Sequence, residues 1–374
     1  MKIVTLALKT SCLATSLCCL LVSCTYINSP AVETSSIIKT APRFKQIYKN
    51  REYSDQKLNF IANTNLLAIS DVEKVIIINL KDQSLVKKIS SADSMIKSGI
   101  STQNGKKFAI STDMSTQIWD TTNWKLLKQF KSKQVSKLSG VSSNGHILYF
   151  DGTLWSLDTY EKIKYFGDET DPGSYDFSND NQYFITSEHH FGAVIIPINS
   201  KNNDILTNRI NNLEKVKFRS DNNYYASYDA KFIVKQGGYR AKTIGLFNIK
   251  NNDLINSYSP NSRITCWTVN DDSEILMGLF NGDIVLLNDK LEITHKWHID
   301  NDHIYTCEKG NNNEVWLGGR KTGIYKADLT SKTLSKTYET SNMITNLKVS
   351  PDNKYLGMTE FLIGESIVKV FELK

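Results

Sequence analysis

The chain has 374 residues, enough for one large folded core, and 40% of them are hydrophobic. A formal charge of +6 is too even a balance of basic and acidic side chains to indicate nucleic acid as a partner. Four of the six cysteines, Cys12, Cys18, Cys19 and Cys24, fall near the N-terminus, which excludes a disulfide-dense scaffold for the rest of the chain.

Residues 1–23 have the pattern of a secretory signal peptide. Lys2 lies near the start, and the apolar run Cys12–Val22 is about 11 residues long, too short to span a bilayer. The run leads into Leu21-Val22-Ser23-Cys24, which resembles the lipobox of bacterial lipoproteins. In that family the cysteine thiol is acylated and the chain is cut before it, so the resemblance implies lipidation at Cys24. An ordinary secretory signal is the alternative.

The same resemblance implies a place in the bacterial cell envelope. Thr25 follows the cysteine, where many lipoproteins kept in the inner membrane have aspartate. A palmitate-type anchor in the outer membrane, with the protein facing the periplasm, is therefore expected in a cell with two membranes. Residues 24–42 contain Ser and Thr, are mixed in charge and lack periodicity, which is typical of a flexible tether.

Residues 43–374 are expected to form one all-β domain. The stretch Lys106–Phe130 contains three short strands, at Phe108–Ser111, Thr116–Asp120 and Lys125–Phe130, and Ser98–Ser101 adds a fourth. A unit of four strands cannot bury its own faces, so it needs copies of itself as neighbours.

Such copies are visible in the apolar second strand, which recurs eight times after a turn rich in Asn, Asp, Gly or Ser. The eight copies begin at Leu67, Phe108, Leu148, Phe184, Tyr225, Leu276, Trp316 and Leu356. A period of roughly 40–45 residues with four strands per unit predicts a single β-propeller of four-stranded blades. Eight blades are favoured, and seven are the alternative if the irregular unit at 183–210 is misassigned.

The repeats are similar to those of a known superfamily. SPDNKYLGMT, beginning at Ser350, and VKVFELK, beginning at Val368, resemble the second and third strands of degenerate WD40 or YVTN-like propeller repeats. In that superfamily an N-terminal strand commonly completes the last blade. The last unit, from Ile344, has three strands, and Phe44–Tyr48 is expected to supply the fourth, because an open sheet edge promotes aggregation.

The fifth unit has an insertion at 228–243, between its second and third strands. It carries four basic residues, one acidic residue and a Gly-Gly turn. In propellers such loops share one face with the blade-to-blade connections, and insertions in repeat arrays often map to the binding face. A solvated hairpin is the alternative. The expected partner contacts are Lys231, Lys235, Tyr239, Arg240 and Lys242.

No catalytic motif is present in the sequence. It has neither a Gly-x-Ser-x-Gly elbow nor a P-loop, and no cofactor is expected. His295 and His298 are three residues apart near a strand, where such side chains point to opposite faces, so no metal site is expected there or with His303. A lactonase-like enzyme or small-ligand binder that uses the central channel is the alternative function.

Cys266 and Cys307 lie 41 residues apart, almost one repeat, in the first strands of adjacent units. Equivalent positions on neighbouring blades point the same way around the ring. We therefore favour two buried free thiols over a disulfide, which an oxidising compartment would permit.

Together these features predict a lipid-anchored envelope propeller that acts as a platform for protein–protein interaction. Its expected partners are the membrane, through the anchor, and an envelope protein.

Overall fold

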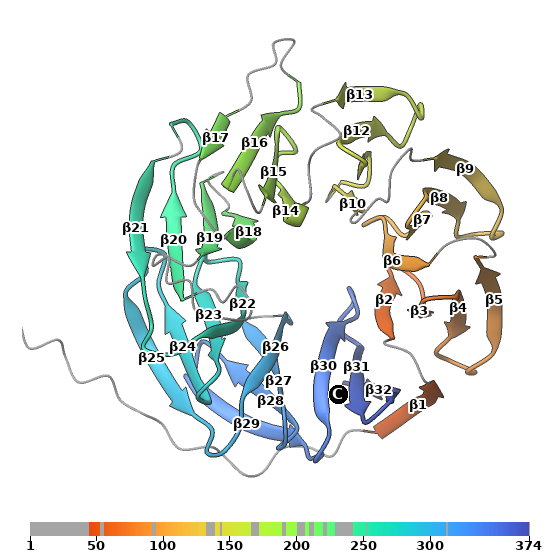
Figure 1. Ribbon diagram of the computed structural model, residues 1–374. Coiled ribbons are helices and arrows are strands. Elements are labelled where there is room, and N and C mark those ends of the chain that lie inside the picture. Colours follow the sequence, from red (N-terminus) through yellow and green to blue (C-terminus); the bar gives the residue numbers. More distant parts are fainter. Residues whose placement is uncertain are drawn as a thin grey trace, which may run out of the picture. The chain divides into compact units, whose positions relative to one another are not determined.

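A computed structural model describes residues 45–52, 56–91, 95–131, 139–142, 144–165, 172–188, 192–199, 206–208, 213–219, 223–228, 242–251, 253–311 and 313–373. These residues form thirty-two β-strands in eight four-stranded antiparallel sheets. Figure 1 shows the sheets arranged as blades around a ring, with the first strand of each blade at the centre. Among the described residues, no helix is long and apolar enough to cross a bilayer.

The blades are numbered here in chain order. Blade 1 contains β2 (Lys57–Ile61), β3 (Leu66–Ser70), β4 (Lys74–Asn79) and β5 (Leu85–Ser90), and blade 2 contains β6 (Ile96–Ser101), β7 (Lys107–Thr112), β8 (Ser115–Asp120) and β9 (Leu126–Lys131). Blade 3 contains β10 (Ser139–Val141), β11 (Ile147–Phe150), β12 (Thr153–Ser156) and β13 (Lys162–Tyr165), and blade 4 contains β14 (Pro172–Phe177), β15 (Tyr183–Glu188), β16 (Gly192–Pro197) and β17 (Leu206–Asn208).

The second half of the chain continues the series. Blade 5 contains β18 (Leu213–Phe218), β19 (Tyr224–Tyr228), β20 (Thr243–Phe247) and β21 (Leu254–Tyr258), and blade 6 contains β22 (Ile264–Val269), β23 (Ile275–Leu279), β24 (Asp283–Leu287) and β25 (Ile293–His298). Blade 7 contains β26 (Ile304–Lys309), β27 (Glu314–Gly319), β28 (Ile324–Asp328) and β29 (Thr333–Tyr338). Blade 8 contains β30 (Met343–Val349), β31 (Tyr355–Leu362), β32 (Glu365–Glu372) and β1 (Lys45–Glu52).

The prediction of an all-β propeller with eight blades is therefore confirmed. The seven-bladed alternative is wrong, because the irregular unit at 183–210 belongs to a complete sheet of its own, blade 4.

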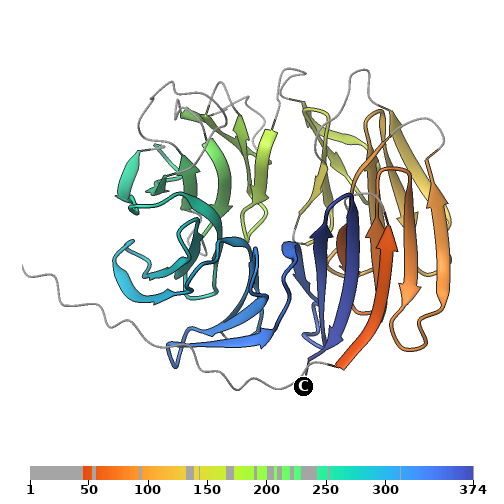
Figure 2. The same ribbon diagram turned by 60° about the horizontal axis from the view of Figure 1, so that its bottom comes forward.

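Blade 8 is assembled from both ends of the ring. Strand β1 pairs antiparallel with β32, so that Lys45 lies opposite Glu372 and Glu52 lies opposite Ser366. Figure 2 shows the two strands side by side. Strand β1 begins at Lys45, one residue after the start of the predicted strand Phe44–Tyr48, and it ends at Glu52, four residues beyond the predicted end. This pairing satisfies the backbone groups on the outer edge of β32.

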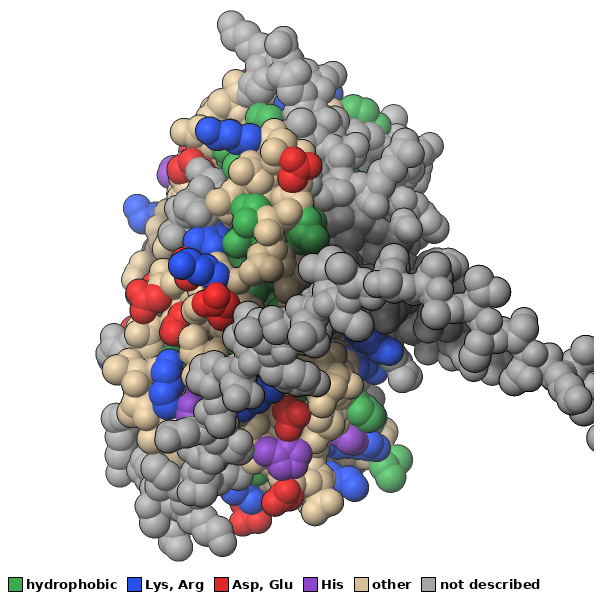
Figure 3. All heavy atoms as spheres, turned by 90° about the vertical axis from the view of Figure 1, so that its left-hand side faces the viewer, with side chains coloured by type: hydrophobic (Ala, Val, Ile, Leu, Met, Phe, Trp, Pro, Cys, Tyr) green, Lys and Arg blue, Asp and Glu red, His purple; other side chains and the backbone are tan. Residues whose placement is uncertain are grey.

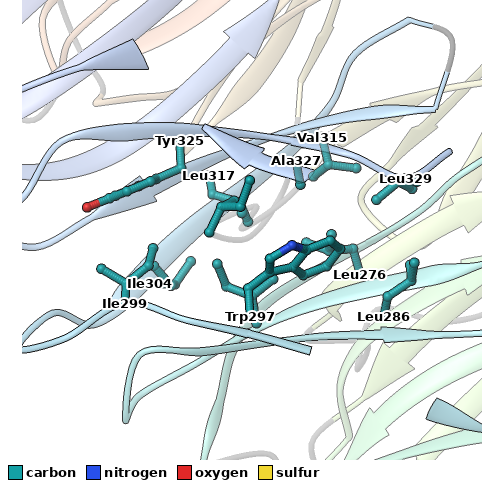
Figure 4. Close-up of a cluster of buried hydrophobic side chains, with 12 residues drawn as sticks. Leu276, Leu286, Trp297, Ile299, Ile304, Val315, Leu317, Tyr325, Ala327 and Leu329 are labelled. Carbon is teal, nitrogen blue, oxygen red and sulfur yellow. The ribbon is translucent and has the colours of Figure 1, made fainter. Parts of the chain in front are cut away.

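The core lies between the faces of neighbouring blades. Between blades 6 and 7, Trp297, Leu286 and Leu276 of one sheet pack against Leu317 and Val315 of the next, all of them at most 1% exposed (Figure 4). Burial of each such aliphatic side chain stabilises the fold by about 1.5–3 kcal/mol. Each blade thus buries one face against the blade before it and one against the blade after it.

The polar turn after the first strand has a recurring hydrogen-bond pattern. In blade 8 the Ser350 hydroxyl donates to Asp352 Oδ1 at 2.7 Å and accepts from the backbone N–H of Tyr355 at 2.9 Å. The same two bonds are made by Thr102, Ser142 and Ser178 in blades 2, 3 and 4. A short hydroxyl side chain can bond the backbone locally in this way, which explains why the repeats have Ser or Thr there.

The expectation of two free thiols is wrong, because Cys266 and Cys307 form a disulfide with Cα atoms 5.6 Å apart. Cys266 pairs with Gly278 across its sheet, and the residue that pairs with the equivalent Gly318 is Thr306. Cys307 therefore lies one position beyond the equivalent of Cys266. Consecutive residues of a strand point to opposite faces, so the one-residue offset turns the two thiols toward each other.

Candidate functional site

Most of the residues predicted as functional lie outside the described part of the chain. This holds for the lipidation site Cys24 and for four of the five predicted partner contacts, Lys231, Lys235, Tyr239 and Arg240. The fifth, Lys242, is exposed and directly precedes β20, the third strand of blade 5. The lipid anchor and the contact loop therefore stay predictions.

An apolar tip projects from blade 8. Strands β31 and β32 have eight residues each, more than the second and third strands of any other blade, which have four to six. At the end of this hairpin Phe361 is 42% exposed, Leu362 38% and Ile363 95%. Gly364, at a φ of +78°, follows them in the turn, with no other atom near its Cβ position. Contiguous exposed apolar side chains are typical of contact surfaces.

Three further exposed apolar residues lie on turns of the next two blades. Val72 is in the β3–β4 turn, Met95 is in the connection from blade 1 to blade 2, and Met114 is in the β7–β8 turn. Backbone hydrogen bonds join these turns, from Ile96 N–H to Val72 O at 2.9 Å and from Asp113 N–H to Met95 O at 3.1 Å.

The six residues come from blades 8, 1 and 2, which are consecutive in the ring. Blade 8 contacts blade 1 here, because the Thr359 hydroxyl donates to the carbonyl of Gln56, directly before β2, at 3.1 Å. We call the set the apolar turn surface: Val72, Met95, Met114, Phe361, Leu362 and Ile363.

A second group of side chains lies at the centre of the ring. The first strands of blades 4 to 8 each have a β-bulge, and the residue two positions past the bulge is polar in all five. We call these residues the inner belt: Asp176, Lys217, Thr268, Glu308 and Lys348.

The inner belt contains two ion pairs between adjacent blades. Lys217 Nζ lies 3.3 Å from Asp176 Oδ1, and Lys348 Nζ lies 2.9 Å from Glu308 Oε2. Asp176 also accepts a hydrogen bond from the backbone N–H of Phe218 at 2.8 Å. The two lysine side chains are 44% and 39% exposed although their strands are innermost, so water reaches the ring centre.

Lys215 lies next to the inner belt, two residues before Lys217 on β18. Its Nζ donates to the carbonyl of Trp267 and lies 4.7 Å from the centroid of that ring. Burial, followed by repulsion from Lys217, lowers the pKa of Lys215 to about 7, while Glu308 and Asp176 act in the opposite direction. Within the described residues no carboxylate forms an ion pair with Lys215.

Sequence reasoning missed the inner belt, although a signal for it exists. Its members are separated by 41, 51, 40 and 40 residues, the steps of the repeat itself. Each lies just before the polar turn that follows the first strand. Aligning the first strands on that turn would have placed the five side chains at one level of the ring.

No metal site was expected at His295, His298 and His303, and the structure does not bring these three side chains together. His298 pairs with Asp283 at 2.6 Å, His295 is buried edge-on against Trp297, and His303 stacks on Phe280 with ring centroids 3.9 Å apart. Across the described ranges, no three His, Cys, Asp or Glu side chains are grouped to hold a metal ion.

The side of the molecule that carries blades 5 and 6 has a mixed charge. Figure 3 shows basic and acidic side chains interspersed over its described residues, with several exposed hydrophobic side chains among them. Leu254 and Ile255, on the outer strand of blade 5, are among the exposed hydrophobic residues of this blade.

Comparisons with solved structures match the whole ring. The chain is similar to the C-terminal WD40 domain of Sif2, with a TM-score of 0.70 and 11% identity over 91% of this chain and 100% of that domain. It is also similar to Sqt1 of Saccharomyces cerevisiae, with a TM-score of 0.69 and 11% identity over 89% of this chain and 100% of that one. A third match is Sqt1 of Chaetomium thermophilum bound to the N-terminus of ribosomal protein L10, with a TM-score of 0.68 and 12% identity over 86% of this chain and 97% of that one.

No protein-family model and no curated protein matches this sequence. At identities this low the structural matches show the fold alone. The chain thus has the WD40-like β-propeller fold.

Proposed function

We propose that this chain is a lipid-anchored platform for protein–protein interaction in the bacterial envelope, and that it binds its partner through the apolar turn surface. The observation that carries the proposal is the blade 8 tip, where Ile363 is 95% exposed beside Phe361 and Leu362. Keeping such a group in water is unfavourable, so a protein partner with a matching apolar patch would gain free energy by covering it.

The direction of β1 supports a protein rather than the anchoring membrane as the occupant. The chain enters blade 8 at Lys45, opposite Glu372, and the β31–β32 turn lies at the other end of the sheet, about 25 Å away for an eight-residue strand. An anchor at Cys24 attaches to the ring through Lys45. The apolar turn surface is thus on the face opposite to the point of attachment.

The known structures of this fold are consistent with such a role. Sqt1 of Chaetomium thermophilum was solved with the N-terminus of ribosomal protein L10 bound to it. A rigid ring that presents turns on two faces suits recognition of a protein segment. The predicted contact loop of blade 5, with Lys242, also joins a second strand to a third, so it belongs to the same class of turns as the blade 8 tip.

Photo-crosslinking in cells tests the proposal, with the crosslinker at Ile363 of the full-length chain. We expect one envelope protein to be captured, and we expect Phe361→Ser with Leu362→Ser to weaken its binding in purified form at least tenfold. The matched control is Leu254→Ser with Ile255→Ser on the outer strand of blade 5, where the side chains are 49% and 52% exposed. Equal binding by both double variants, or capture of lipid alone, would contradict the proposal.

The anchor is tested separately. Cys24→Ala should block lipid labelling and release the protein from the outer membrane fraction, whereas Cys19→Ala should do neither. Equal membrane retention of the Cys24 variant would contradict the lipid anchor but would leave the binding surface untouched.

An enzyme or small-ligand binder at the ring centre was the alternative expectation. The inner belt favours the ligand-binding part of it, since Lys217 and Lys348 are both ionic and open to water. This second candidate function concerns a different place in the fold.

A further inference from the structure

The charges at the ring centre are not balanced within the described residues. Lys217 and Lys348 each have a carboxylate partner, and Lys215 adds a third amino group near the same two carboxylates, Asp176 and Glu308. The ammonium of Lys215 donates to a backbone carbonyl, which is a neutral acceptor. Because an ammonium has three N–H donors, Lys215 can donate to a further acceptor.

We propose that the ring centre binds a small anion with a carboxylate or phosphate group, held by Lys215 together with Lys217 and Lys348. The three side chains come from the first strands of blades 5 and 8, with the first strands of blades 6 and 7 between them in the ring, so the ligand lies on the inner side of the ring along this arc of four blades. When all three lysines are protonated they carry one positive charge more than Asp176 and Glu308 together can balance, and a bound anion would balance that charge.

The surroundings of Lys215 explain how an anion would be held. The charged groups that act on it electrostatically are Lys217 on its own strand, Asp176 on β14, Glu308 on β26 and Lys348 on β30, and β22 contributes the carbonyl and ring of Trp267, which it contacts directly. Charged hydrogen bonds in a partly buried place are stronger than those at an open surface. Lys217 and Lys348 can add a donor each without leaving their own carboxylates.

The protonation of Lys215 gives the site a signature. Burial and repulsion from Lys217 lower the pKa of Lys215 to about 7, and an anion beside the ammonium must raise it again. Binding then takes up a proton near neutral pH. With one group of this pKa, affinity should be about tenfold higher at pH 6 than at pH 8.

Isothermal titration calorimetry on the full-length protein tests the proposal with two probes, sulfate and succinate, at an ionic strength held constant with chloride. Sulfate represents tetrahedral oxyanions and keeps its charge between pH 6 and pH 8. We expect binding of at least one probe, tighter at pH 6. Binding of sulfate alone assigns the phosphate class, and binding of succinate alone assigns the carboxylate class.

Three variants make the test specific. Lys215→Met should weaken binding at least tenfold, and Lys215→Arg should retain it while abolishing its pH dependence, since arginine stays charged. Lys88→Met, on the outer strand of blade 1, is the control and should change nothing. Binding of neither probe, or equal affinity of the wild type and Lys215→Met, would overturn the proposal. Both results are independent of the apolar turn surface.

Discussion

Glu360 is fully buried, and its Oε2 lies 2.9 Å from the Nζ of Lys369 on the neighbouring strand of blade 8. The carboxylate also accepts from Asn342 at 3.2 Å, and the lysine donates to the hydroxyl of Tyr338 in blade 7 at 2.8 Å. The pair thus joins two blades away from water.

Removing one charge of this pair should be costly. Lys369→Met leaves the Glu360 carboxylate buried without its cation, so we expect a loss of about 3–5 kcal/mol in the free energy of unfolding, measured with urea. Lys354→Met is the matched control, because its pair with Asp352 is largely exposed and should contribute far less to stability. Combining Lys369→Met with Glu360→Gln should recover much of the loss, and similar losses for Lys369→Met and Lys354→Met would contradict the expectation.

The Cys266–Cys307 disulfide should be a measurable part of the stability of the ring. It closes a loop of 41 residues and joins the first strands of blades 6 and 7, so its loss should cost about 2–4 kcal/mol. Reducing agent should lower the melting temperature of the wild type and leave that of Cys266→Ala with Cys307→Ala unchanged. Peptide mapping after thiol labelling of denatured, unreduced protein should find both residues unlabelled. Labelling of either one would argue against the bond.

The number of blades could be predicted from the sequence because the second strands keep their spacing. They are the most buried strands, so their apolar pattern survives where the turns differ, as Leu67 and Leu356 illustrate with 0% exposure each. The disulfide was missed because a spacing of 41 residues was treated as one full repeat. The repeat step between blades 6 and 7 is 40 residues, from Gly278 to Gly318, so Cys266 is level with Thr306 and Cys307 lies one position beyond it, on the opposite face of its strand.

The apolar turn surface and the inner belt were also harder to predict than the number of blades. Phe361-Leu362-Ile363 has the composition of a buried strand, and its exposure follows from a hairpin that is longer than those of the other blades. The inner belt mixes Asp, Lys, Thr and Glu, so it does not stand out as a motif. It becomes a group because the ring brings positions about 40 residues apart to one level.

Closure of the ring by β1 should be needed for stability. Deleting 45–52 exposes the edge of β32 along its whole length, so we expect a lower melting temperature and aggregation. Deleting 25–32, the same number of residues from the predicted tether, should have neither effect. Light scattering and thermal unfolding of the two deletions distinguish these outcomes, and identical behaviour would mean that β1 does not stabilise the ring.

Lys215 should make the stability of the protein depend on pH. Its pKa is lowered to about 7 in the folded protein from an ordinary value of 10.5. Between these values the unfolded chain binds more protons than the folded one, so this group makes stability rise with pH from about 7 to about 10.5. Below about pH 7 Lys215 is protonated in both the folded and the unfolded protein, so the folded state bears the full free-energy cost of holding the ammonium at the ring centre.

Replacing Lys215 by methionine, which has a similar length, should therefore stabilise the protein at low pH. One unit of pKa difference corresponds to about 1.4 kcal/mol, and the partial exposure of Lys215 reduces the total, so we expect a gain of about 1–2 kcal/mol at pH 6 that disappears near pH 10. Urea unfolding in chloride buffers measures this gain without the stabilisation that a bound oxyanion would add. Lys88→Met should show no change at either pH, and a Lys215→Met protein less stable than the wild type at pH 6 would mean that the contacts of Lys215 with Trp267 outweigh the cost of its charge.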